Sequence, residues 1–210
     1  MRYEKKYRIE DASMLQVLEN LSGSPAGFKS AFPDRWVNSI YYDDIELSAF
    51  HDNLAGLSKR LKHRIRWYGE DMLVAKKPKL EKKIKNNELG TKEFIALPDF
   101  RTDSGLNASR LLYDAYPKGH SLHPVVLIRY LRTYLESYDH KFRATIDREM
   151  QYYLYQGNLL FPLSPTLDPA LILEVKFAQA DREEAEYLLQ KIPFRLTKNS
   201  KYVSGVLSNY

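Results

Sequence analysis

The sequence contains no cysteine among its 210 residues. Disulfide bridges and thiolate chemistry are therefore excluded, and a reducing compartment is allowed. No apolar run approaches the ~18 residues that a membrane-spanning helix needs. The opening stretch MRYEKKYRIE also lacks the apolar region of a secretory signal. We therefore expect a soluble, cytoplasmic protein, with any membrane-embedded partner on a separate chain.

The common nucleotide-binding loops are missing as well. Neither GxxxxGK[ST] nor GxGxxG occurs, so bound phosphates would have to be held by side chains. The chain has no internal repeat, low-complexity tract or obvious linker, which favours a single domain over residues 1–210. A hydrophobic fraction of 44% and a net charge of +5 indicate a globular protein that favours anionic partners. Charge alone does not separate nucleic acid from nucleotides or lipid surfaces.

The most informative segment that is present reads RLKHRIRWYG, residues 60–69. Successive side chains of a β-strand point to opposite faces, so this strand would have one mostly apolar face and one cationic face. His63 and Ile65 should then point away from the cations, and Trp67 should pack in the core or at the rim of a barrel. For a single strand, a charged face is most simply a solvated surface. The cations are Arg60, Lys62, Arg64 and Arg66.

A similar polar-face pattern recurs in other segments, which weakens the interpretation as a solvated surface. Segments 2–9, 77–85, 141–149 and 170–177 alternate in the same way, and 124–137 is β-rich with a less regular alternation. Segments 36–44 and 151–157 are also predicted to be strands. Helices are expected near 10–22, with Asp11 as N-cap, and over 46–56, 105–117 and 181–192. We therefore predict a mainly antiparallel α+β fold. In it, about eight strands form a closed barrel with a polar, basic lumen, and a few helices pack outside.

Cations inside such a lumen would be costly, by several kcal/mol per ion, unless a polyanion lies there. Arginine suits a phosphate ligand because its planar fork donates bidentate hydrogen bonds to phosphate oxygens. Four strands also carry one carboxylate on the parity of their cations, and carboxylates are ligands for a hard divalent cation. These carboxylates belong to Glu4, Glu81, Asp147 and Glu174.

Eight motifs then carry a resemblance that runs along nearly the whole chain. In order they are YEKKY, NSIYYDD, KHRIRWYG, LEKKIKNNELGTK, VVLIRYLRTYL, FRATID, LEVKF and KNSKYVSG. Together they resemble the VTC domain, the polyphosphate polymerase domain of the vacuolar transporter chaperone family, in its compact bacterial form. This family belongs to the triphosphate tunnel (CYTH-like) superfamily, whose members hold a triphosphate inside an eight-stranded antiparallel barrel.

The resemblance implies an enzyme that transfers the γ-phosphoryl group of ATP to a growing polyphosphate chain with Mn²⁺ or Mg²⁺. The motifs do not fix the alignment over residues 69–92, so the resemblance does not distinguish which of Lys83, Lys85 and Lys92 matches the family's phosphate-binding lysine. The residues expected in catalysis are Arg64, Arg66, Arg132, Arg143 and Lys201. Those expected to bind substrate are Lys6, Lys62, Lys83, Lys85, Tyr130, Lys176, Lys198 and Ser200. The expected metal ligands are Glu174 and Glu4.

Two other functions stay open. A tunnel triphosphatase could use the same cations, with Glu4 or Glu81 orienting water to cleave inorganic triphosphate or a nucleoside triphosphate. The first strand reads Arg2-x-Glu4-x-Lys6, whereas the superfamily's hydrolases have ExExK, and this departure fits the polymerase branch. The chain could also be a non-catalytic binder of polyphosphate or nucleotides. DNA and RNA are not expected partners, because the cations alternate with apolar residues instead of forming an exposed run.

Overall fold

The computed structural model describes residues 2–86, 89–103, 105–119, 121–156, 159–160 and 165–208. Its elements are mainly antiparallel strands, with five α-helices in the described ranges. The strands are β1 Arg2–Ile9, β2 Lys29–Asp43, β3 Lys59–Tyr68, β4 Val74–Ala75, β5 Lys79–Asn86, β6 Leu89–Ala96, β7 Phe100–Arg101, β8 His123–Glu136, β9 Phe142–Gln156, β10 Leu159–Leu160, β11 Thr166–Asp168 and β12 Leu171–Ala178. The helices are α1 Met14–Ser22, α2 Ser48–Leu54, α3 Gly105–Ala115, α4 Arg182–Gln190 and α5 Lys201–Leu207, with short 3-10 turns at Pro117–Gly119 and Gln179–Asp181.

The main sheet runs in the order β1-β12-β9-β8-β2-β3-β5-β6, with β10 and β11 attached to β9. Strands β4 and β7 form a separate two-stranded sheet. The eight strands along this path agree with the expected number and the antiparallel α+β class. The expected closed barrel is not supported, because β1 and β6 end the path without pairing to each other in the described part of the chain. Closure would require hydrogen bonds between these two edges.

The chain forms two compact units. Unit 1 comprises Met1–Arg35, Leu131–Glu149 and Pro169–Asn199. Unit 2 comprises Trp36–Tyr130, Met150–Asp168 and Ser200–Tyr210. The strands β2, β8 and β9 contribute residues to both. The expectation of a single domain over 1–210 stays a prediction.

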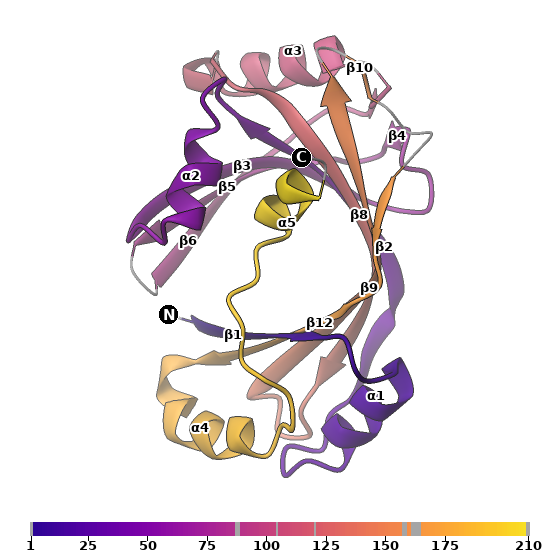
Figure 1. The fold of residues 1–210 in the computed structure, drawn as a ribbon, viewed down its shortest axis with the longest axis vertical. Helices are drawn as coiled ribbons and strands as arrows, with labels where there is room; N and C mark the ends of the chain where they lie inside the picture. The colour runs from indigo at the N-terminus through magenta and orange to yellow at the C-terminus, as the bar shows by residue number, and fades with distance from the viewer. Residues whose placement is uncertain are drawn as a thin grey trace. The chain divides into compact units, whose positions relative to one another are not determined.

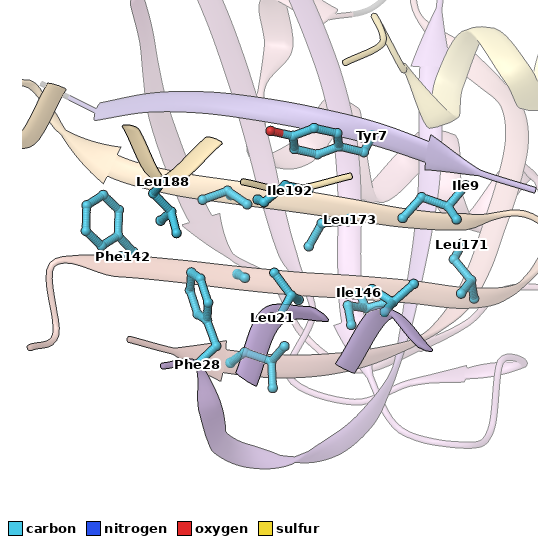
Figure 2. Packing of buried hydrophobic residues seen from close by; sticks show 14 of the residues in the cluster. Tyr7, Ile9, Leu21, Phe28, Phe142, Ile146, Leu171, Leu173, Leu188 and Ile192 are labelled. Carbon is cyan, nitrogen blue, oxygen red and sulfur yellow. The ribbon is translucent and has the colours of Figure 1, made fainter. Parts of the chain in front are cut away.

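The core of unit 1 forms where the apolar sides of β1, β9 and β12 meet two helices. Figure 2 shows Tyr7, Ile146 and Leu173 from these strands beside Leu21 of α1 and Leu188 of α4. All five side chains are at most 2% exposed. Both helices therefore cover the apolar side of these strands, as Figure 1 also shows, and the alternate residues of the strands are left to form a polar side.

The N-cap of helix α1 lies two residues after the expected cap, Asp11. Ser13 is the N-cap: its Oγ accepts a hydrogen bond from the Gln16 backbone, while the Gln16 side chain accepts one from the Ser13 backbone. This reciprocal capping box satisfies two amide groups that the helix itself cannot pair. The expectation of Asp11 as N-cap was therefore wrong, and the Ser-x-x-Gln spacing is the signal that would have located the cap.

The core of unit 2 lies between its strands and α3. Ile65 and Trp67 of β3 pack with Leu80 of β5 and with Ala108 and Leu112 of α3. Figure 1 shows α3 on one side of these strands and α5 on the other. Ile65 therefore lies on the side away from Arg64 and Arg66, as predicted, and Trp67 packs in the core, one of its two predicted places. His63 is buried on the same side, where its ring stacks on Tyr116 at 5.4 Å.

Two elements differ from the sequence-based expectation. The predicted strands 141–149 and 151–157 are parts of one strand, β9, in which Glu149 adopts a left-handed φ of 53°, a conformation that often accompanies a bulge. Residue 157 lies outside the described residues. Strand β2 begins at Lys29, well before the expected start at Trp36.

None of the described helices combines the length and the apolar character needed to cross a membrane.

Candidate functional site

The polar side of unit 2 carries the cations of β3. In the antiparallel register, Arg64 lies opposite Tyr41 of β2 and Glu81 of β5, and Arg66 lies opposite Ser39. Residues paired in this way share a face of the sheet. We call this surface the arginine face; it consists of Ser39, Tyr41, Lys62, Arg64, Arg66, Glu81 and Tyr130.

All three nitrogens of the Arg64 guanidinium have close partners. Its Nε and Nη2 donate to Glu81 Oε2 at 2.8 and 2.5 Å, and its Nη1 donates to the Tyr41 hydroxyl at 2.9 Å. The side chain is 14% exposed. Charge-assisted hydrogen bonds of this length hold the fork in one orientation, so Arg64 is preorganised on the arginine face.

Arg66 is more buried than Arg64 and is held less tightly. The residue is 9% exposed. Its donors reach Ser39 Oγ and the Tyr130 hydroxyl at 3.4 Å, and its Nη1 lies 3.7 Å from Glu81 Oε1. These distances exceed those usual for charge-assisted hydrogen bonds. A buried guanidinium with only long contacts can form shorter bonds with a ligand that carries negative oxygens.

Helix α5 lies on the same side of unit 2 and brings further polar groups to the arginine face. Ser200 caps α5, and its Oγ also accepts a hydrogen bond from Lys62 Nζ at 2.8 Å. Lys201 Nζ lies 4.9 Å from the centre of the Tyr130 ring, within the range of a cation–π contact. Tyr202 stacks on Tyr41 at 5.3 Å. The start of α5 therefore adds Lys201 to the cations of β3.

The electrostatics of the arginine face follow from one carboxylate shared by two arginines. Burial disfavours the ionised form of Glu81, but Arg64 and Arg66 outweigh this effect and lower its pKa to about 2. Burial likewise opposes ionisation of Tyr41, yet Arg64 and Arg66, followed by Lys201, lower its pKa below the usual value. Both shifts indicate a positive local potential. The face therefore favours an additional anion.

The polar side of unit 1 has a different composition. The registers place Lys6 opposite Glu174 and Glu4 opposite Lys176, and Asp147 lies one strand further on β9. Acids and bases therefore alternate across neighbouring strands. We call this surface the carboxylate face; it consists of Glu4, Lys6, Arg132, Asp147, Glu174 and Lys176.

Arg132 and Asp147 form the tightest ion pair of the carboxylate face. Nε and Nη2 of Arg132 donate to the two oxygens of Asp147 at 2.5 and 2.7 Å. The Asp147 side chain is fully buried, and the Arg132 side chain is 12% exposed. The hypothesis that Asp147 ligates a cation is not supported by this pairing, and Glu81 is likewise held by Arg64. We expected a bound polyanion to neutralise the cations of these strands. The carboxylates of Glu81 and Asp147 supply part of that negative charge themselves.

Glu174 and Glu4 are neighbouring carboxylates on the adjacent strands β12 and β1. Their side chains lie within hydrogen-bond distance of each other. Burial opposes ionisation of Glu174, but Lys6 and Lys176 hold its pKa well below the usual value. Glu174 therefore offers an ionised, buried carboxylate with Lys176 Nζ at 3.2 Å and Arg132 Nη2 at 3.8 Å.

These two carboxylates fit Mn²⁺ or Mg²⁺ as a partial ligand set. Magnesium is usually held by one or two carboxylates, with water and substrate phosphates completing its shell. Within the described residues, no cluster of three or more acidic, histidine or cysteine side chains is placed to hold a metal. A cation at Glu4 and Glu174 would therefore depend on the oxygens of a bound phosphate.

The chain matches one protein family along its whole length. The model of the VTC domain matches residues 1–210. The chain belongs to the VTC domain family. No curated protein matches it in sequence.

Solved structures share the fold of this VTC domain at low sequence identity. A candidate adenylate cyclase from Vibrio parahaemolyticus has a TM-score of 0.55 at 12% identity, covering 99% of this chain and 97% of that chain. A candidate adenylyl cyclase from Hippeastrum, described as having a dominant triphosphatase activity, has a TM-score of 0.53 at 14% identity, with coverages of 98% and 95%. The PH1819 protein of Pyrococcus horikoshii has a TM-score of 0.52 at 13% identity over 100% of both chains.

The remaining predicted site residues of this VTC domain lie in varied surroundings. Arg143 has a side chain that is 64% exposed and donates to Glu136 Oε1 at 3.1 Å. Lys198 is exposed, and Lys83 is half-buried. The side chain of Lys85 lies outside the described residues.

Tyr41 and Tyr202 are structural partners of the site that sequence reasoning did not assign to it. The Tyr202 hydroxyl donates to Asp43 Oδ2, and Asp43 also accepts hydrogen bonds from the backbone of Ala49 and Phe50 at the start of α2. Asp43 therefore ties α2 to α5, and Tyr202 supports the ring of Tyr41 beside Arg64. The tyrosines in NSIYYDD and SKYVSG were the available signal, but their contact spans the chain.

Proposed function

We propose that this VTC domain is a polyphosphate polymerase that uses ATP as its phosphoryl donor. In the transfer, the bond from the γ-phosphorus to the β–γ bridging oxygen breaks. A terminal phosphate oxygen of the acceptor chain forms the new bond, and ADP leaves. The acceptor oxygen is already anionic, so no general base is required; water would be the acceptor at initiation. Catalysis then rests on positioning and on charge stabilisation.

The observation that carries the proposal is the loosely held guanidinium of Arg66. A buried arginine is ordinarily matched by close acceptors, because desolvation of an unmatched charge is costly. Arg66 instead has contacts of 3.4 to 3.7 Å and shares Glu81 with Arg64. A triphosphate would supply oxygens to both arginines, and this supports phosphate as the ligand of the arginine face.

The proposed roles follow the two faces. On the arginine face, Arg64 and Arg66 stabilise the charge on the transferred phosphoryl group, and Lys201 assists them. Arg132 and Arg143 are proposed to take the same role in unit 1. The proposed substrate-binding residues are Lys6, Lys62, Lys83, Lys85, Tyr130, Lys176, Lys198 and Ser200.

Glu174 and Glu4 are proposed to hold Mn²⁺ or Mg²⁺ on the carboxylate face. A divalent cation supplies charge neutralisation on phosphate oxygens when it is bound. Lys6 and Lys176 keep Glu174 ionised, as its lowered pKa indicates. The chain's own contribution is thus a carboxylate ready to bind a cation without first losing a proton.

A tunnel triphosphatase is the second candidate. The Hippeastrum protein, which shares the fold, is described as having a dominant triphosphatase activity. A hydrolase would need a carboxylate to orient water. However, Glu81 is engaged by Arg64, and Glu4 lies 2.9 Å from Lys6 Nζ. These pairings favour an anionic acceptor over an activated water.

Product analysis tests the proposal. The protein is incubated with ATP and Mn²⁺, and the products are separated into acid-insoluble chains and orthophosphate. We expect long acid-insoluble chains with ADP released in proportion. Orthophosphate as the only phosphate product would contradict the polymerase proposal and support the triphosphatase. Tight triphosphate binding without any turnover would instead indicate a non-catalytic binder, and competition by short DNA would extend this to nucleic acid.

A further inference from the structure

The first half of β2 is unusually exposed for a strand in the interior of the sheet order. Its register with β3 begins only at Val37. Before that point, Lys29, Ser30 and Phe32–Arg35 are exposed and Ala31 is half-buried. Phe32 is 57% exposed. A large aromatic ring in water contributes little to the core, and a ligand that covers it gains hydrophobic free energy.

Phe32 forms one surface together with its neighbours Arg35 and Tyr134. We call these three residues the aromatic corner. The rings of Phe32 and Tyr134 meet edge to face, 6.0 Å apart at 89°. The Arg35 guanidinium lies 4.8 Å from the centre of the Tyr134 ring and 5.8 Å from that of Phe32. The corner therefore combines exposed ring surface with a planar cationic donor. Aromatic rings and arginine planes of this kind stack on nucleobases.

Within unit 1, the aromatic corner lies beside the carboxylate face. Tyr134 and Arg132 are alternate residues of β8, so they share a face and are about 7 Å apart along the strand. Leu135, the next residue along β8, points to the opposite side of the strand and packs into the core of unit 1. The corner thus borders Arg132, whose guanidinium approaches Glu174 at 3.8 Å. In a nucleoside triphosphate, only the ribose separates the α-phosphate from the base.

We propose that the aromatic corner is the nucleobase subsite for the donor, with the base stacked on Phe32 and Arg35 donating to the edge of the base. This inference rests on the proposed function. It adds that the donor is recognised as a nucleotide and not only as a triphosphate. Stacking depends on ring area, so purine nucleotides should bind more tightly than pyrimidine nucleotides, without a strict requirement for adenine.

Calorimetric titration with ATP and with inorganic triphosphate, both with Mn²⁺, tests the subsite. In Phe32→Ala, we expect the affinity for ATP to fall about tenfold, with the affinity for inorganic triphosphate unchanged. Phe32→Trp should restore ATP binding. Its new indole should also be quenched by ATP and not by inorganic triphosphate.

The matched control is Tyr187→Ala on α4. Tyr187 is 55% exposed and has a cation, Lys191 Nζ, 5.3 Å from its ring centre, but it lies on a helix that covers the apolar side of unit 1. This variant should leave both affinities unchanged.

The outcomes separate this inference from the proposed function. Equal weakening of both ligands in Phe32→Ala, or an unchanged affinity for ATP, overturns the subsite while triphosphate binding by the wild type keeps the proposed function standing. Wild-type protein that binds neither ligand overturns both. If Phe32→Ala does not fold, Phe32→Trp decides the matter, and the absence of ATP-specific quenching then overturns the subsite.

Discussion

The arginine face and the carboxylate face use similar residues in different proportions. On the arginine face, two arginines share Glu81, and Arg66 makes only long contacts. On the carboxylate face, Arg132 has its own buried partner, Asp147, and Glu174 lies near a lysine and an arginine. A surface with an excess of cations attracts an anionic ligand, whereas on a surface with equal numbers of acids and bases the charges largely neutralise one another. We therefore propose that the first face binds phosphate directly and that the second needs a metal to do so.

The largest expected effect comes from removing one key group on each face. Arg66→Ala and Glu174→Ala should each lower the rate of ATP turnover about 100- to 1,000-fold, the first through lost charge stabilisation and the second through lost metal binding. Turnover with Mn²⁺ is measured beside a circular-dichroism melt that monitors the fold.

Arg110→Ala and Glu186→Ala are the matched controls, because these side chains are 84% and 59% exposed on helices α3 and α4. They should retain wild-type rates. A folded Arg66→Ala or Glu174→Ala variant that keeps most of its activity would remove that face from the site.

A smaller effect should appear in the stability of unit 2 as a function of pH. The pKa of Glu81 is about 2 in the folded protein and 4.5 in its ordinary state. Its stabilising contribution is therefore complete above pH 4.5 and is lost as the pH falls toward 2. Each pKa unit corresponds to about 1.4 kcal/mol, so the contribution is on the order of 3–4 kcal/mol.

Urea denaturation of wild type and Glu81→Gln at pH 7, 5, 4 and 3 measures this contribution. The difference in the free energy of unfolding should be largest at pH 7 and should shrink below pH 4.5. Glu93→Gln is the control, because Glu93 also pairs with a cation, Lys82, but its side chain is 59% exposed. A difference between wild type and Glu81→Gln that stays constant with pH would show that Glu81 does not carry the compensating charge.

The two faces were predictable to different extents. Alternation within β3 places Arg64 and Arg66 together because the side-chain period of a strand is local. The pairing of Arg64 with Glu81 depends on strand register, which turn geometry and burial set together. Sequence reasoning therefore identified the cations of the arginine face, but it interpreted Glu81 and Asp147 as carboxylates suited to a cation and did not foresee their pairing with Arg64 and Arg132.

Long-range features of the fold were the least predictable. The hydrogen bond from Tyr202 to Asp43 joins residues that lie 159 positions apart, and no local pattern specifies it. Closure of the sheet likewise depends on whether its edge strands β1 and β6 meet, although the strand number and antiparallel class followed from short amphipathic segments. The aromatic corner was missed because β2 was expected to begin at Trp36, so that Phe32 lay outside the predicted strand.

The smallest expected effect separates the faces without any catalysis. Inorganic triphosphate in the presence of EDTA should bind through the arginine face alone. Arg64→Ala should then weaken binding about tenfold, the loss typical of a hydrogen bond between charged groups. Glu174→Gln should leave this metal-free affinity unchanged, because Glu174 belongs to the carboxylate face and is proposed to act only through a cation. Adding Mn²⁺ should tighten binding to wild type and Arg64→Ala but not to Glu174→Gln. Calorimetry measures all six constants, and a metal-free affinity that falls equally in both variants would mean that the two faces do not differ in the way their charges indicate.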